Sequence, residues 1–132
     1  MKLAIGLMVV SILSQLFGYL FAVPAHIMDP SWPDHARFHT LQAVFWLIGL
    51  AGISLALIWW PFRRKELWSI GALLFAVVCS QVGYFLAIAA IPEGAPPLVG
   101  SNTLLALILV MYLVGVGLGW REMKKSPPPQ KS

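Results

Sequence analysis

The chain has 132 residues, of which 59% are hydrophobic and 11% are charged. Soluble domains carry about 25% charged residues, so this composition excludes a water-soluble globule, and it also excludes intrinsic disorder, which requires low hydrophobicity and high charge. The net charge of +4 comes from 9 Lys and Arg against 5 Asp and Glu. Most of these bases lie in one loop and in the C-terminal tail, so they indicate membrane orientation rather than nucleic-acid binding.

Four apolar segments are long enough to cross a membrane, because a helical span needs about 20 mostly apolar residues. They cover residues 3–22, 35–60, 67–91 and 103–120, and proline-containing loops separate them. We therefore predict an all-α, integral membrane four-helix transmembrane bundle in one domain, residues 1–120. The polar, proline-rich residues 121–132 are predicted to be a disordered cytoplasmic tail.

The basic residues predict how the bundle is oriented. Lys2, residues 63–65 and the tail after residue 120 are all on one side of the predicted bundle. Lys and Arg concentrate on the cytoplasmic side of membrane proteins, so we expect both termini in the cytoplasm. The first span resembles a secretory signal with a site at Val23-Pro24-Ala25, but its apolar run is long for a signal, and we expect it to be retained.

The first and third spans share a short pattern. Ser14–Ala22 and Ser80–Ala87 both read S-Q-x-G-Y-x-x-A once a residue is deleted from the first. One interpretation is a duplication of two spans about an axis along the membrane normal; the other is chance similarity between apolar helices. Under the first interpretation, Gln15 and Gln81 occupy equivalent places.

Polar side chains within the spans concentrate toward the predicted outer face. At about 1.5 Å rise per residue, Gln15 and Gln42 lie about 10 Å, and Gln81 about 15 Å, from the outer ends. Tyr19 and Tyr84 lie in the same half. Because polar groups in hydrocarbon are costly unless paired, we expect these side chains to share an interior chamber.

The start of the second span carries a row of polar residues at helical spacing. His35, His39 and Gln42 stand at i, i+4 and i+7, which is one helix face, and Trp46 continues it inward. A purely structural interpretation has Asp34 capping the helix and Arg37 reaching the interface or pairing with an acid.

A second interpretation is a pocket for a small apolar or lipid-like molecule, since such sites combine apolar walls with a few polar groups. His39 would then also be available as an acid or base, although the sequence assigns no reaction. The candidate ligand-binding residues are His39, Gln42, Gln15, Gln81, Tyr19, Tyr84 and Trp46, with His35, Asp34 and Arg37 at the mouth.

A third interpretation is a metal site formed by His26, His35 and His39, because imidazoles at i and i+4 can reach one ion. Haem held between two deep histidines is disfavoured, since the other three spans contain no histidine. A proton-coupled antiporter is disfavoured as well, because no acid lies within any span.

Gly115 and Gly119 are spaced so that another helix can approach closely. The approaching helix belongs either to the same bundle, to a second copy, or to a partner. The last possibility makes the chain an accessory subunit of a larger membrane complex.

The stretch Pro33-Asp34-His35-Ala36-Arg37-Phe38-His39 resembles a P-x-H-A-x-F-H motif at the second helix of small bacterial four-helix membrane proteins, among them DoxX-like and uncharacterised families. The resemblance implies a four-helix bundle in a bacterial inner membrane. It implies little about activity.

Overall fold

The computed structural model describes residues 1–90 and 99–125, except for the side chains of residues 25, 26 and 99–101. Within these ranges the chain is helical and contains no strand. The elements are α1 (Lys2–Ile27), α2 (Asp34–Leu57), the π-helical η1 (Ile58–Phe62), α3 (Trp68–Val77), the π-helical η2 (Val78–Val82), α4 (Gly83–Ala90) and α5 (Val99–Lys125). The predicted all-α four-helix bundle is confirmed.

Among the described residues, four helical stretches are long and apolar enough to cross a membrane: Lys2–Pro24, Asp34–Phe62, Trp68–Ala90 and Asn102–Lys125. Large apolar side chains such as Phe21, Phe45 and Trp46 point outward from them. In lipid, exposed apolar side chains carry no penalty, while backbone polar groups must be paired within the helix. Both features fit an integral membrane protein in a lipid bilayer.

Two helices are longer than the sequence suggested. α1 continues through Pro24 to Ile27, where we expected a loop, and the Met28 amide still donates to the Pro24 carbonyl (3.0 Å). α5 continues to Lys125, into the predicted tail, where Met123 is buried in the bundle and Glu122 pairs with the N-terminal ammonium. The remainder of that tail, residues 126–132, lies outside the described residues.

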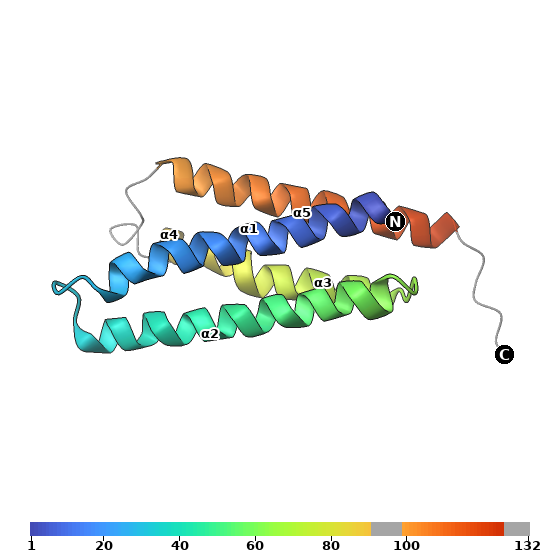
Figure 1. The fold of residues 1–132 in the computed structure, drawn as a ribbon. Helices are drawn as coiled ribbons and strands as arrows, with labels where there is room; N and C mark the ends of the chain where they lie inside the picture. Colours follow the sequence, from blue (N-terminus) through green and yellow to red (C-terminus); the bar gives the residue numbers. More distant parts are fainter. Residues whose placement is uncertain (91–98, 126–132) are drawn as a thin grey trace.

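Figure 1 shows α1 running between α5 and α2, antiparallel to both, with the N-terminus beside the carboxyl end of α5. The N-terminal ammonium pairs with Glu122 at this end. α1 packs most extensively on α5 and then on α2, and α3 packs on α2 and α5.

Two glycines of α5 allow close approach within the bundle. A Cβ at Gly115 would stand 2.8 Å from Cγ of Met8 and 2.9 Å from the Ala4 carbonyl oxygen, and a Cβ at Gly119 would overlap the ring of Phe62. The close contact predicted from these glycines therefore serves packing inside the bundle.

The tightly packed core occupies only one half of the bundle. Met8, Ile58, Phe62 and Leu73 are almost completely buried in the half that contains the N-terminus. Toward the opposite end, the last buried side chains of the four spans are Gln15, Val44, Gln81 and Ile108, and every described side chain beyond them is half-buried or exposed. We call this second part, near Ile27 and Asp34, the open half.

Candidate functional site

Two glutamines meet where the tightly packed core ends. Nε2 of Gln81 donates to Oε1 of Gln15 (3.2 Å), and Nε2 of Gln15 donates to the Ser80 carbonyl (3.4 Å). Gln15 is 7% exposed and Gln81 is 3% exposed. Because buried amides are costly without partners, this mutual pairing explains how both are accommodated inside an apolar bundle.

Gln15 lies 13 residues after Lys2 and 12 before Ile27, at the middle of α1. Because α1 extends beyond residue 22, Gln15 lies further from the end of its helix than the sequence predicts. Its place in the outer half of the membrane stays a prediction. The structure brings Gln15 and Gln81 into contact, while their equivalence by duplication of the spans stays a prediction.

The π-helical segment η2 presents both partners of Gln15. A π-bulge adds one residue to a helical turn and interrupts the regular α-helical backbone hydrogen bonds. Such bulges occur often at functional positions. Here the Ser80 carbonyl is reached by a side chain of α1, and the next residue, Gln81, points into the bundle. Cys79, one residue before Ser80, is exposed instead.

A cavity of about 20 Å³ adjoins the pair. Its polar lining comes from Gln15, Ser54, Ser80, Gln81 and Tyr112. Oε1 of Gln81 has no hydrogen-bond partner in the described part of the chain. A cavity needs roughly 10–15 Å³ to hold one water molecule. This space therefore admits a group of one or two heavy atoms, and it is too small for the lipid-like molecule that we expected an interior chamber to hold.

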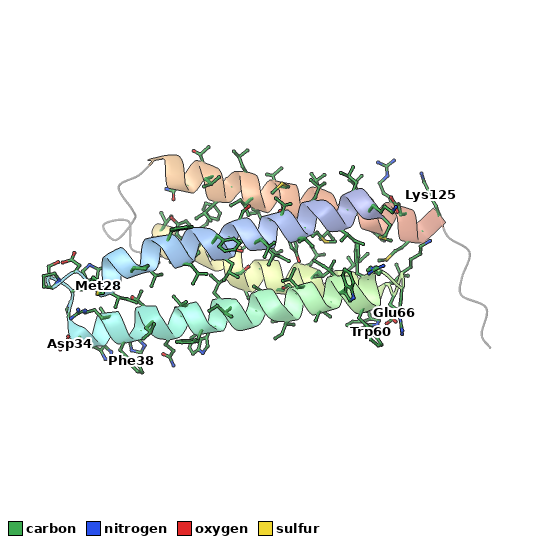
Figure 2. All side chains as sticks on the ribbon, in the orientation of Figure 1. Met28, Asp34, Phe38, Trp60, Glu66 and Lys125 are labelled. Atoms are coloured by element: carbon green, nitrogen blue, oxygen red, sulfur yellow. The ribbon has the colours of Figure 1, made fainter. Side chains whose placement is uncertain are left out.

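The histidine row of α2 is formed, but it faces outward. Nε2 of His35 lies 3.0 Å from Nε2 of His39, and Nδ1 of His39 lies 3.3 Å from Oε1 of Gln42. Both histidines are exposed, Gln42 is half-buried, and Trp46 is 70% exposed. Figure 2 shows the neighbouring Phe38 also directed away from the bundle.

The predicted site residues thus do not share one chamber. Gln15 and Gln81 lie inside, while His35, His39 and Trp46 lie on the outer surface of α2. The inward face of α2 instead carries its buried residues Val44, Ala51 and Ser54. The small and apolar side chains of this face pack closely against the neighbouring helices. We infer that this packing turns the face inward and leaves the histidine face on the outside.

The two predicted tyrosines lie in the open half. Tyr19 on α1 and Tyr84 on α4 are both half-buried. The Tyr84 hydroxyl donates to Oδ1 of Asn102 (2.8 Å), which joins α4 to α5. Tyr84 therefore forms a hydrogen bond between two helices in the open half, further from the N-terminus of the bundle than the glutamine pair.

Asp34 and Arg37 fix the connection between α1 and α2. α2 begins at Asp34 itself, with Pro33 at the N-cap position and no side-chain capping bond, so the predicted Asp34 cap is wrong. Nη1 of Arg37 donates to Oδ1 of Asp34 (3.2 Å), which is the acid pairing that we expected, and its Nε donates to the Ile27 carbonyl (2.6 Å). Arg37 thereby ties α2 to the end of α1.

The described residues contain no group of three or more His, Cys, Asp or Glu side chains placed to hold a metal ion. His35 and His39 supply two neighbouring nitrogens. The third predicted ligand, the His26 side chain, lies outside the described residues.

Sequence reasoning did not single out several polar residues that the structure buries or half-buries, among them Ser54, Tyr112 and Asn102. Ser54 donates to the Leu50 carbonyl (2.8 Å), Tyr112 donates to the Leu73 carbonyl (3.1 Å), and Asn102 accepts from Tyr84. Ser54 and Tyr112 are isolated polar residues within apolar runs, which is the same signal that identified the glutamines.

Comparisons with protein families, with curated proteins and with solved structures give no match for this chain. The resemblance of residues 33–39 to DoxX-like proteins therefore finds no support there, and function has to be argued from the site alone.

Proposed function

We propose that this membrane protein binds a small apolar or lipid-like molecule in the open half of its bundle. The observation that carries the proposal is the change in packing at the glutamine pair. On all four spans, burial ends at this level, and the described side chains beyond it are half-buried or exposed. Loosely packed helix ends leave apolar surface that a ligand entering from the bilayer can cover.

The chemistry of the open half suits an amphipathic ligand. Binding sites for such molecules combine apolar walls with a few polar groups that fix orientation. Tyr19 and Tyr84 provide half-buried hydroxyl groups, and Leu16 and Phe85 provide apolar surface. A ligand with one hydroxyl or carbonyl group and an apolar body satisfies both kinds of surface.

The test is lipid extraction and native mass spectrometry of the protein purified in a mild detergent. The double variant Tyr19→Phe/Tyr84→Phe removes the two hydroxyl groups and keeps the aromatic rings. Its matched control is Ser14→Ala, which removes an exposed hydroxyl of α1.

We expect wild type and the Ser14→Ala control to carry the same small molecule, and the double tyrosine variant to carry much less of it. Equal amounts of the same species in all three proteins, or no bound species in any, would reject the proposal.

A second candidate function is metal binding at the surface row of α2. Two imidazole nitrogens on one tetrahedral zinc ion, at about 2.0–2.1 Å each, lie roughly 3.3 Å apart. The 3.0 Å between the Nε2 atoms of His35 and His39 is close to that separation. Metal analysis of purified wild type and of His35→Ala/His39→Ala decides this candidate: we expect about one zinc or other transition-metal ion per wild-type chain and a sharp decrease in the variant.

We also propose a bacterial inner membrane location with both termini in the cytoplasm. Lys2, Arg63, Arg64 and Lys125 support this orientation, since the basic side of a membrane protein faces the cytoplasm, and Figure 2 draws Lys125, Glu66 and Trp60 at one end of the bundle. Single cysteines at Ser31 and at Lys65, in a Cys79→Ser background, test it with an impermeant maleimide. We expect Ser31→Cys to react in intact cells and Lys65→Cys to react after lysis; the reverse pattern contradicts the orientation.

A further inference from the structure

Two tryptophan–arginine stacks lie side by side at the end of the second span. Cζ of Arg63 lies 4.3 Å from the ring centroid of Trp59, and Cζ of Arg64 lies 4.3 Å from that of Trp60. These four side chains line an open depression in the surface. We call it the Trp–Arg pocket.

The backbone beneath this pocket is held firmly. Pro61 and Phe62 are buried between the exposed tryptophans and arginines. The turn that follows is closed by the Lys65 amide donating to the Phe62 carbonyl (3.0 Å) and the Glu66 amide donating to the Pro61 carbonyl (3.0 Å). The two stacks therefore stand on an ordered turn, which lowers the entropy cost of binding a ligand.

Among the described residues, no acceptor takes a hydrogen bond from the guanidinium of Arg63 or Arg64. Stacking uses the face of the guanidinium, whereas its N–H donors lie in the plane and point away from the ring. Within residues 1–90 and 99–125, neither Arg63 nor Arg64 forms a salt bridge with an acid. The neighbouring Glu66 accepts from Nε1 of Trp68 (2.7 Å). The pocket thus carries two positive charges that the described part of the chain leaves without an anion.

We propose that the Trp–Arg pocket binds the phosphate headgroup of an anionic phospholipid. Arg recognises phosphate through paired N–H donors, and tryptophan prefers the level of the headgroups. Trp59 and Trp60 belong to the last turns of the candidate span Asp34–Phe62, so we expect the arginines just beyond the hydrocarbon. An anionic headgroup supplies the charge that two arginines require, whereas a zwitterionic headgroup brings its own cation.

The test uses wild-type protein reconstituted in vesicles with equal phosphatidylglycerol and phosphatidylcholine, then extracted for native mass spectrometry. Arg63→Gln/Arg64→Gln removes the two charges of the pocket. Lys124→Gln/Lys125→Gln is the matched control, because it removes two exposed charges at the same end of the bundle and one cation–π stack, Lys124 on Trp120, that lines no such pocket. Circular dichroism verifies that each variant is folded.

We expect wild type to retain phosphatidylglycerol in preference to phosphatidylcholine. Each basic residue near an anionic surface contributes about fivefold to affinity through unspecific attraction, and this part is lost equally in both variants. The arginine variant is expected to lose about tenfold more than the lysine variant, because it also loses the charge-assisted hydrogen bonds. Arg63→Lys/Arg64→Lys is expected to fall between wild type and the glutamine variant.

Two outcomes would overturn the proposal. Equal losses in the arginine and lysine variants would mean that the charge acts diffusely and that there is no site. Addition of inorganic phosphate to protein in phosphatidylcholine separates the lipid from a free anion: we expect no adduct, and saturable phosphate binding would show a soluble-anion site instead.

Discussion

Replacing Gln15 by Met tests the central hydrogen-bonded pair. Met has nearly the shape of Gln but neither of its amide groups. The substitution removes the acceptor of Gln81 Nε2 and the donor to the Ser80 carbonyl. Gln81 is then left with its whole amide unpaired, since its Oε1 already has no partner.

The expected loss of stability in Gln15→Met follows from the burial of the Gln81 amide. A buried polar group left unsatisfied costs about 1–3 kcal/mol, while hydrogen bonds between membrane helices average about 0.6 kcal/mol and reach about 1.7. We therefore expect Gln15→Met to lower the free energy of unfolding by about 1–2 kcal/mol. Replacing both partners by apolar groups is nearly neutral, so Gln15→Met/Gln81→Met is expected to be less destabilised than the sum of the single variants, with a coupling of about 1 kcal/mol.

The assay is equilibrium unfolding in mixed micelles by increasing the fraction of SDS, followed by tryptophan fluorescence and circular dichroism. Gln42→Met is the control, because Gln42 is half-buried and its partner His39 is exposed; we expect a change below about 0.5 kcal/mol. The reasoning is refuted if Gln15→Met costs no more than this control, or if the two single effects simply add.

The same assay checks three further predictions. Gly119→Ala is expected to cost about 1–3 kcal/mol, because its Cβ would overlap the buried ring of Phe62, whereas Gly117→Ala has open space and should change stability by less than about 0.5 kcal/mol. Tyr112→Phe loses one buried hydrogen bond to α3 and is expected to cost about 0.5–1.5 kcal/mol; no loss would mean that this bond contributes nothing. Arg37→Met frees the end of α1, so we expect limited proteolysis to cleave residues 28–33 faster than in wild type.

The number of helices and their apolar character follow from the sequence, because hydrocarbon accepts only segments that satisfy their own backbone. The ends of the helices do not follow as closely. Pro24 and residues 121–125 look like loop or tail, yet they continue their helices near the membrane. The close approach at Gly115 and Gly119 was also predictable, since two glycines at i and i+4 remove the side chains that would separate two helices.

Which polar residues meet was decided only by the tertiary structure. In an apolar span every face is hydrophobic enough to be buried, so a histidine row does not by itself identify the inward face. On α2 the face with Ser54 and Ala51 packs inward and the one with His39 turns outward. On the third span, the π-helical segment sets the direction of Gln81. In lipid, the hydrophobic effect does not choose between faces, and close packing and hydrogen bonding between helices make that choice.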